Sequence, residues 1–515
     1  MQGHHLYWGD SHANIHHKHM GDLRPALEFA RQMIDFWPMA YYPLWNFPIK
    51  GCLVEDWRPR EELDGDWKII CDFAAAHNKP GELVVFPGYE WHGDATWGDH
   101  NVFFLADHPS MFFADTIDEL YADIRRSGLK AYAIPHHTGY LPGVRSKNWD
   151  HYDEELSPFT EIFSVHGCSE SDEEWIGLRH NQNMGTGVSG GTAQDGLARG
   201  YRLGIICSND SHDSLPAVYR MGTMACYAKS LTREALWEAM AERRVYGVTG
   251  DRIELDFSVE SAAMGSVIRK SGPVRCLAKV RCTDALDRIE LLRNNRVIAT
   301  HCHQGTWDAP AGPGRIRCKL RVEAGWNASP KWTPDLPPRA WDCSIEVPDG
   351  AVVGVEKCWQ KPGQRVAKPG GRRCEFGFTT QQIGPEHMGL HTEATVFELE
   401  GRPGDTVRLV VEGKAVRMTL GEAMSGSRVV HFMEENTEYF CTLHGLTRAE
   451  LPRFDRMYYY GPKAKLHRAI PEAGLVGELD FVDRTPPSGG RNHYRVRVSQ
   501  RNGQVAWSSP VWVES

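Results

Sequence analysis

The first half of the chain alternates between short apolar runs and segments whose apolar residues recur at helical spacing. The apolar runs are rich in β-branched and aromatic residues, which predicts strands. The predicted strands are His5–Asp10, Leu83–Tyr89, Asn101–Leu105, Ala131–Pro135, Glu161–Val165, Leu203–Ser208 and Thr223–Tyr227. The predicted helices are Arg24–Ile34, Trp67–His77, Thr116–Ser127, Glu170–Gln182 and Thr232–Arg244. Such alternation predicts a mainly parallel sheet, open or closed.

The pattern changes after about residue 250. Helical periodicity nearly disappears, and alternating apolar and polar positions are separated by clusters of Gly and Pro. The alternating segments are Val274–Cys282, Arg288–Ala299, Arg315–Val322, Asp405–Val411 and Tyr494–Val498. They predict an all-β, sandwich-like domain with long loops rich in Pro and Gly. We therefore expect two domains, residues 1–250 and residues 251–515.

Composition narrows the class of protein. Of 515 residues, 41% are hydrophobic and 24% are charged, as in globular proteins. Neither an apolar stretch of bilayer length nor a signal-peptide pattern is present, so we expect a cytoplasmic protein without a membrane partner. The net charge of −9 argues against a nucleic-acid partner. The 13 cysteines are odd in number and include no Cys-x-x-Cys spacing, which predicts reduced thiols.

Metal-binding side chains stand at the ends of the predicted strands. Sixteen of the 24 histidines fall within the first 212 residues. The side chains that follow strand ends are Asp10, His12, Glu90, His136, His137, His166, Asp210 and His212. Neutral imidazole and carboxylate suit Zn, Mn or Fe, and barrels of parallel strands collect function at their carboxyl ends. The pattern predicts one shared metal site.

Each of these segments also has a structural interpretation. A single histidine after a strand is usually a hydrogen-bonded structural residue. Asp210-Ser211-His212 alone is compatible with a turn. Glu90 alone is compatible with half of an ion pair, and His4 and His5 with a solvated run. Five such sites at five strand ends favour the metal site over five separate coincidences.

The same segments resemble the PHP (polymerase and histidinol phosphatase) superfamily, and more closely its branch known as domain of unknown function 3604. The resemblance rests on residues 7–12 (YWGDSH), 88–91 (GYEW), 100–102 (HNV), 134–138 (IPHHT), 161–167 (EIFSVHG), 208–212 (SNDSH), 243–252 (RRVYGVTGDR) and 506–510 (AWSSP). It implies a distorted, seven-stranded, TIM-like α/β barrel. We expect this barrel to be followed by the all-β, sandwich-like domain.

Residue by residue, the resemblance implies a set of metal ligands and no organic cofactor. The implied ligands are His12, Glu90, His136, His166, Asp210 and His212. The chain departs from the superfamily pattern twice: Asn14 replaces the second His of an opening His-x-His, and no Thr-Asp-His stands near Tyr41. We therefore expect one or two divalent ions (Zn, Mn or Fe) rather than three, with His16 or His19 as substitute ligands.

Three further residues are candidates for catalytic roles. We expect His137 to act as a proton shuttle or to support the ligand beside it. We expect Asp10 to orient the ring of His12, and His100 to line the pocket together with His92. Basic residues in nearby loops are candidates for binding an anionic substrate, and none of them is assigned individually. They are Arg145, Lys147, Arg199, Arg202, Arg220 and Arg252.

These features predict a metal-dependent hydrolase that uses a metal-activated water on a small-molecule substrate, by resemblance a phosphoesterase. One alternative is a metal-dependent hydrolase or lyase that acts on a carbohydrate-derived or other C–N or C–O substrate. A second alternative is a non-catalytic binding protein with a degenerate metal site. The sequence leaves open whether the chain forms a homo-oligomer and what the second domain does.

Overall fold

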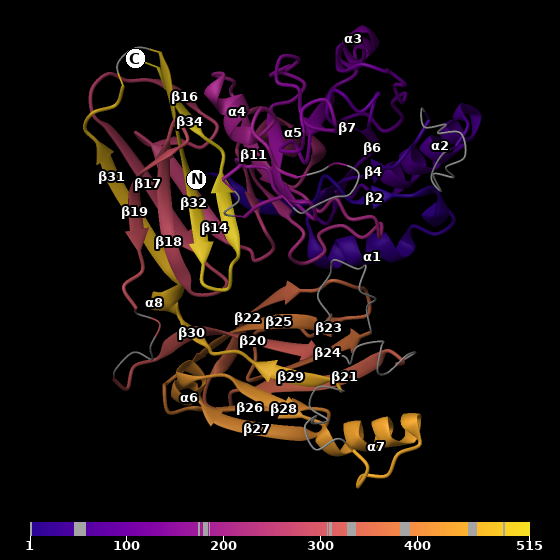
Figure 1. Cartoon of the computed structure of the whole chain (residues 1–515). Helices are drawn as coiled ribbons and strands as arrows, with labels where there is room; N and C mark the ends of the chain where they lie inside the picture. Colours follow the sequence, from indigo (N-terminus) through magenta and orange to yellow (C-terminus); the bar gives the residue numbers. More distant parts are fainter. Residues whose placement is uncertain are drawn as a thin grey trace. The chain divides into compact units, whose positions relative to one another are not determined.

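The structure is a computed structural model, and it describes most of the chain. The described residues are 3–45, 58–173, 176–178, 184, 186–305, 307, 312–326, 336–381, 392–451, 461–487 and 490–514. They form two compact units (Figure 1). Unit 1 comprises Met1–Arg281, Asp287–Cys302 and Gly477–Ser515, and unit 2 comprises Cys282–Leu286 and His303–Val476. This division does not test the predicted domain boundary between residues 250 and 251.

A large mixed sheet forms the centre of unit 1. Its main strands, in spatial order, are β16 (Val267–Arg269), β34 (Val511–Glu514), β32 (Arg491–Gln500), β33 (Val505–Ser508), β13 (Val245–Val248), β12 (Thr223–Ala228), β1 (His5–Gly9), β3 (Phe36–Pro38) and β5 (Val84–Phe86). The strands β1, β3 and β5 are parallel, whereas β12 and β13 are antiparallel to their neighbours. Strands from both ends of the chain therefore share one sheet.

Two smaller sheets carry most of the remaining predicted strands. One contains β2 (Asn14–Ile15), β4 (Ala40–Tyr41), β6 (Gly88–Trp91), β7 (His100–Phe104) and β8 (Ala131–Pro135). The other contains β10 (Gly167–Cys168), β9 (Phe159–Ser164) and β11 (Gly204–Cys207). Six of the seven predicted strands are confirmed in position, whereas the predicted strand Leu83–Tyr89 is divided between β5 and β6 in two sheets. Among the described residues the strand pairings form no closed barrel. The mixed α/β class is confirmed, and the TIM-like barrel is not.

Strand direction explains the difference from the predicted parallel sheet. The strands β6, β7 and β8 are neighbours in sequence and pair antiparallel. The segment between β6 and β7 is too short for the crossover that a parallel pair requires. Long connections allow either direction, since β9 and β11 pair parallel whereas β7 and β8, separated by α3 (Ile117–Ser127), pair antiparallel.

The helices of unit 1 are α1 (Arg24–Met33), α2 (Arg60–His77), α3 (Ile117–Ser127), α4 (Ala193–Ala198) and α5 (Arg233–Ala241). Of these, α1, α3 and α5 lie close to their predicted bounds, α2 begins seven residues earlier than predicted, and α4 was not predicted. Thr116 and Glu119 form a capping box at the start of α3, and Gly128, with φ of 69°, ends it. The described residues within the predicted helix Glu170–Gln182 form no helix, and residues 174, 175 and 179–182 lie outside the described ranges.

The remaining strands of unit 1 are β14 (Glu254–Val259), β15 (Ala262–Ala263), β17 (Val274–Arg281), β18 (Leu286–Arg293), β19 (Arg296–Cys302) and β31 (Val476–Asp483). Of these, β15, β14, β17 and β31 form a four-stranded sheet, and β18 pairs with β19 and β32. The segment Arg288–Ala299, predicted as one alternating stretch, is the hairpin of β18 and β19. It turns at Asn294 and Asn295, whose φ values of 49° and 66° are typical of a tight two-residue turn.

Residues 506–510 connect the last strands of unit 1 to its first ones. The Ser509 hydroxyl accepts a hydrogen bond from the Ile205 N–H at 2.9 Å and donates one to the Val245 carbonyl at 2.5 Å. The Trp507 indole N–H donates to Glu170 Oε2 at 2.8 Å. The motif is buried, so its place in the resemblance reflects packing rather than exposed chemistry.

Unit 2 consists of two antiparallel sheets that share one apolar core. The first sheet contains β22 (Ala351–Cys358), β25 (Thr392–Gly401), β20 (Ile316–Gly325), β29 (Lys463–Leu466), β28 (Arg428–His431) and β30 (Ile470–Pro471). The second contains β23 (Arg365–Val366), β24 (Arg373–Thr380), β21 (Arg339–Glu346), β26 (Thr406–Val411) and β27 (Lys414–Thr419). Leu320 and Phe397 of the first sheet pack with Trp341, Phe376 and Leu409 of the second.

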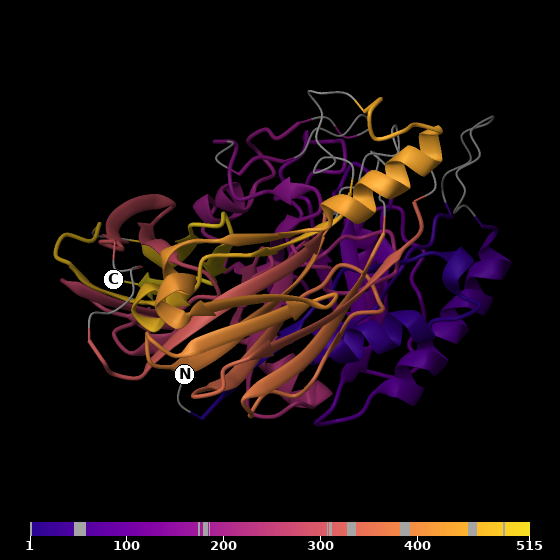
Figure 2. The same cartoon turned by 90° about the horizontal axis from the view of Figure 1, so that it is seen from below.

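Three helices complete unit 2: α6 (Leu420–Ser425), α7 (Met433–His444) and α8 (Glu472–Leu475). Figure 2 shows α7 projecting at one end of the orange strands of this unit. Within the described ranges, none of the helices combines the length and apolar character needed to cross a bilayer.

Candidate metal centre

The predicted ligands converge at one end of the strands of unit 1. His12 follows β1, Glu90 lies on β6, and His136 follows β8. His166 follows β9, and Asp210 lies three residues beyond β11. Four of these five residues are at most 3% exposed, and the side chain of His166 is 14% exposed. Residues up to 198 positions apart in the chain therefore share one buried region.

The imidazole of His12 occupies the middle of this region. Its Nε2 lies 3.3 Å from Asp210 Oδ1 and 3.5 Å from Glu90 Oε2, and its Nδ1 lies 3.2 Å from Glu161 Oε2. Ligand atoms of His12, His136, Glu161 and Asp210 all lie within 4.8 Å of one another. Two ligands about 2.1 Å from one cation are at most about 4.2 Å apart, so small shifts would bring these atoms to bonding distance.

Two overlapping groups extend the cluster. Glu90, His136 and His137 form one, and His137, His166 and Asp210 form the other, each with ligand atoms within 4.8 Å. His166 Nε2 lies 3.2 Å from Asp210 Oδ2, and its Nδ1 lies 2.8 Å from the Tyr140 hydroxyl. His137 and Asp210 have positive φ values of 33° and 52°, a backbone strain that is common at functional sites.

The residues of this cluster fit a divalent cation. Neither ring nitrogen of His136 makes a hydrogen bond within the described part of the chain, and neither does Nδ1 of His137, although all three atoms are buried. A buried polar atom without a partner costs about 1–3 kcal/mol. A cation would bind one nitrogen of each ring together with the surrounding carboxylates, and both the donor types and their spacing suit Zn, Mn or Fe.

Electrostatics favours the same occupant. Burial lowers the pKa of His12, but Asp210, Glu161 and Glu90 outweigh it, and the pKa is raised well above its usual range. A field that strongly stabilises an imidazolium also attracts a metal cation. Burial and the neighbouring charge of His12 hold the pKa of His136 well below its usual value, and burial with His166 lowers that of His137 to about 3. Both rings are therefore in the neutral form that binds metals.

Asp10 does not contact the ring of His12, and that part of its predicted role is wrong. Its Oδ1 accepts hydrogen bonds from the backbone N–H groups of His12 and Asn209, both at 3.0 Å, and its Oδ2 accepts one from the Ala217 N–H at 2.7 Å. Burial raises the pKa of Asp10 to about 6, against the effect of these three donors. Asp10 ties together the backbones that present His12 and Asp210, while Glu161 contacts the ring.

His100 is turned away from the cluster. Its Nδ1 lies 2.8 Å from the Gly98 carbonyl, and its Nε2 lies 3.2 Å from Nζ of Lys147. Burial and the adjacent Lys147 hold the pKa of His100 well below its usual range. Both nitrogens are engaged, so the geometry gives no support to the predicted role of His100 in the pocket.

His212 lies at the edge of the centre. Its side chain is 48% exposed, and its Nε2 is 3.9 Å from Asp210 Oδ1. Its Nδ1 lies 2.9 Å from Nε2 of His16, a residue that the sequence named as a substitute ligand. Asn14 stands where the superfamily pattern has the second His of its opening His-x-His. It donates its side-chain N–H to Asp210 Oδ1 at 3.1 Å. Asn14 thus orients a candidate ligand.

The sequence did not identify Glu161, His92 and Asp99 as ligands. Glu161 was overlooked because it lies within β9 rather than after its end. A signal for it was present, since a glutamate inside a strand of six buried residues needs a partner. His92 and Asp99 join Glu90 in a further group whose ligand atoms lie within 4.8 Å of one another.

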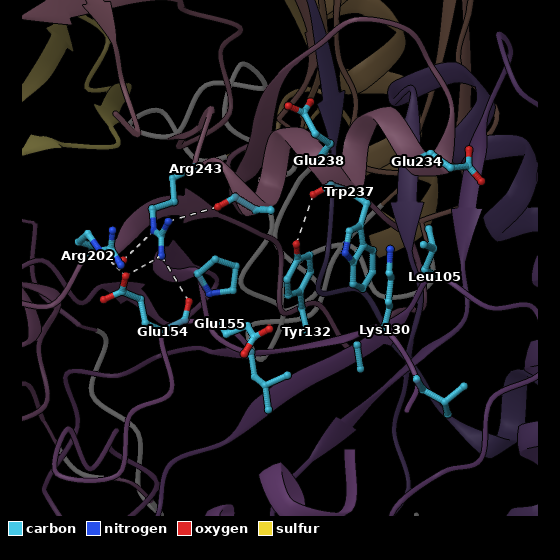
Figure 3. Close-up of a pocket in the computed structure, with 15 residues that line it drawn as sticks. Leu105, Lys130, Tyr132, Glu154, Glu155, Arg202, Glu234, Trp237, Glu238 and Arg243 are labelled. Atoms are coloured by element: carbon cyan, nitrogen blue, oxygen red, sulfur yellow. Dashed lines mark hydrogen bonds and ion pairs between the residues drawn. The ribbon is translucent and has the colours of Figure 1, made fainter. Parts of the chain in front are cut away.

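A separate pocket of about 880 Å³ lies near the start of β8 (Figure 3). Tyr132 stacks on Trp237 there, with ring centroids 4.0 Å apart, and its hydroxyl donates to the Trp237 carbonyl at 3.3 Å. Arg243 and Glu154 line the pocket beside them. Tyr132 is four residues before His136, or roughly 13 Å along an extended strand. This pocket is therefore distinct from the metal centre.

A family model described as "Protein of unknown function (DUF3604)" matches residues 217–265. The chain is similar to this family over that segment. The matched segment begins at Ala217, whose N–H binds Asp10, and runs through β12, α5 and β13 to the hairpin of β14 and β15. It holds part of the scaffold of the centre and none of its candidate ligands.

Curated proteins similar to this chain include uncharacterised chlamydial proteins. One from Chlamydia pneumoniae is 24% identical over 47% of this chain and 42% of its own length. One from Chlamydia trachomatis is 29% identical over 30% of this chain and 27% of its own. The chain thus spans less than half the length of the curated relatives it matches.

A solved structure is also similar. It is described as a two-domain protein containing predicted PHP-like metal-dependent phosphoesterase from Bacteroides vulgatus. The alignment covers 81% of this chain and 96% of that one, at 12% identity and a TM-score of 0.33. A TM-score of this size supports no conclusion about the present chain.

Proposed function

We propose that this protein is a metal-dependent hydrolase that acts on a small-molecule substrate and, by its resemblance to the PHP superfamily, a phosphoesterase. The main support is the buried convergence of His12, His136, Glu161 and Asp210, with neither nitrogen of His136 hydrogen-bonded within the described residues. A divalent cation bound there supplies Lewis acidity and lowers the pKa of a water at an open position toward about 7. The proposal includes the distorted barrel that the resemblance implies.

The chain's own residues fix the orientation of the ligands. Glu161 faces Nδ1 of His12 at 3.2 Å, which directs Nε2 of that ring toward Glu90 and Asp210. The Tyr140 hydroxyl does the same for Nδ1 of His166 at 2.8 Å. Contacts of this kind set the tautomer and raise the basicity of a ligating histidine, and their loss typically costs 10–100-fold in metal affinity.

An anionic substrate would find a positive charge beside the cluster. The guanidinium of Arg145 pairs with Asp99, and its side chain is 18% exposed. Arg145 was one of six basic residues in the predicted pool. Lys147 instead contacts His100 and the His151 carbonyl, and Arg199 pairs with Asp150. Arg145 is our candidate for binding a phosphate or carboxylate group, because its partner Asp99 belongs to the ligand group that contains Glu90.

The two departures from the superfamily pattern support a second candidate, a metal-dependent hydrolase or lyase for a non-phosphate substrate. Tyr42 stands where the resemblance leads one to expect an aspartate or histidine. Its ring packs against His16, His92 and His212 at centroid distances of 4.7, 5.0 and 5.2 Å. An aromatic wall in place of a ligand pair changes the groups that line the substrate side of the centre.

A reconstitution experiment tests both candidates. Metal-stripped protein would be loaded with Mn²⁺, Zn²⁺ or Fe²⁺ and assayed with p-nitrophenyl phosphate and bis-p-nitrophenyl phosphate. We expect metal-dependent turnover that falls more than about 100-fold in His136→Gln, with the partly exposed His151→Gln as the matched control. Bound metal without phosphoester turnover would favour the second candidate. Protein that binds no metal would contradict both.

A further inference from the structure

The hairpin of β6 and β7 brings Asp99 close to Glu90 and His92. It lies beside the group of His12, His136, Glu161 and Asp210, which we call the His12 cluster. The strands β6 and β7 pair antiparallel, with Trp91 opposite His100. The chain between them turns back, so His92 at the start of the turn meets Asp99 at its end. Ligand atoms of Glu90, His92 and Asp99 lie within 4.8 Å of one another, and these residues are 3%, 1% and 1% exposed.

Several polar atoms of this group are buried and unpaired. Neither ring nitrogen of His92 makes a hydrogen bond within the described residues, although its Nε2 lies 3.0 Å from Glu90 Oε1. Oδ1 of Asp99 also makes none among them. Burying an imidazole and a carboxylate oxygen without partners is unfavourable. One cation among them would bind one nitrogen of His92 together with Oδ1 of Asp99 and an oxygen of Glu90.

The other oxygen of each carboxylate already has a contact. Asp99 Oδ2 pairs with the guanidinium of Arg145 and lies 3.5 Å from Nε2 of His137. Glu90 Oε2 lies 3.5 Å from Nε2 of His12. Oδ1 of Asp99 and Oε1 of Glu90 are thus the oxygens that face the group of Glu90, His92 and Asp99. Oε1 of Glu90 also lies 3.4 Å from Nε2 of His136.

The charges leave room for a cation. Arg145 offsets the charge of Asp99. The contacts of the Glu90 carboxylate, among the described residues, are with histidines and not with Lys or Arg. The edge of the Tyr42 ring packs against the His92 ring, with centroids 5.0 Å apart, which holds the imidazole in place. One imidazole and two carboxylates form a ligand set suited to Mn²⁺, Fe²⁺ or Zn²⁺.

We propose that Glu90, His92 and Asp99 bind a divalent cation of their own, in addition to metal at the His12 cluster. Glu90 would be shared, with Oε1 facing the new position and Oε2 facing His12. This inference goes beyond the proposed function and depends on it only through Glu90. It assigns a metal-binding role to His92 and Asp99, neither of which is among the ligands that the superfamily resemblance implies.

Counting bound metal tests this assignment. Metal-stripped wild type, His92→Gln and Asp99→Asn would be titrated with Mn²⁺, and the bound equivalents counted by mass spectrometry and by the Mn²⁺ electron paramagnetic resonance signal. We expect each variant to bind one equivalent fewer than the wild type. His108→Gln, whose side chain is 60% exposed, should bind as many as the wild type. Equal numbers in the wild type and both variants would overturn the proposal.

A second measurement avoids the risk that a variant misfolds. Crystals of the wild type soaked in Mn²⁺ should show an anomalous-scattering peak about 2.2 Å from ligand atoms of Glu90, His92 and Asp99. Peaks confined to the His12 cluster would overturn the assignment. Neither experiment requires turnover, so a protein that binds the additional ion but hydrolyses nothing would contradict the proposed function alone.

Discussion

The interiors of the two units bury very different side chains. Around His12, unit 1 buries imidazoles and carboxylates, among them Glu90, Glu161 and Asp210. Unit 2 buries Trp341, Phe376 and other apolar side chains between its two sheets. Apolar packing gains stability without further partners, whereas buried charges are unfavourable until they are paired. Unit 1 therefore holds, beside its own apolar cores, a cluster of buried charges suited to a cation, whereas the core between the sheets of unit 2 is apolar.

Removing one carboxylate should affect only the charged interior. Asp210 belongs to two of the ligand groups, with His12 and with His166. We expect Asp210→Asn to weaken Mn²⁺ binding by more than about 100-fold, because an amide oxygen carries no charge to attract the cation. Titration calorimetry of metal-stripped protein measures this, with the exposed Asp172→Asn as the control. Unchanged affinity in Asp210→Asn would remove Asp210 from the centre.

Making a cavity in unit 2 should have the complementary effect. Leu409 is fully buried between the sheets, and we expect Leu409→Ala to destabilise unit 2 by about 2–5 kcal/mol while metal content stays at the wild-type value. Urea unfolding measures the loss. Val429→Ala, at a position 37% exposed, should change stability by less than about 0.5 kcal/mol. Loss of metal in Leu409→Ala would show that the two interiors depend on each other.

Metal removal should loosen unit 1 selectively. A ligand present at 100 times its Kd stabilises the folded state by about 2.7 kcal/mol, and chelation removes that contribution. Hydrogen exchange should therefore speed up in peptides from β9 after chelation, while peptides from β24 exchange as before. Equal acceleration in both peptides would contradict the contrast between the interiors.

The buried amine of Lys147 should give unit 1 a pH dependence. Burial lowers the pKa of Lys147 from 10.5 to about 7. Between these values the unfolded chain holds a proton that the folded chain has lost, so stability should rise with pH by at most about 1.4 kcal/mol per unit and level off above pH 10.5. Urea midpoints at pH 7.5 and 9.5 measure the slope. Lys147→Met should flatten it, and an equal slope in that variant would assign the effect to another group.

Local patterns predicted most of the secondary structure of unit 1. The strand β8 has the predicted bounds Ala131–Pro135, and α3 follows its cap at Thr116. Both signals act within a few residues, because side-chain alternation and capping depend only on neighbours in the chain. The metal-binding side chains at strand ends were visible for the same reason.

Tertiary structure decided the contacts between distant residues. Glu161 meets His12 across 149 positions, Asp10 binds backbone N–H groups instead of that ring, and His100 turns toward Lys147. The direction of β12 and the absence of a closed barrel among the described strands also depend on how separate strands pair. Local sequence chooses which atoms can bind a metal. Only long-range packing sets which of those atoms lie close enough to share one ion.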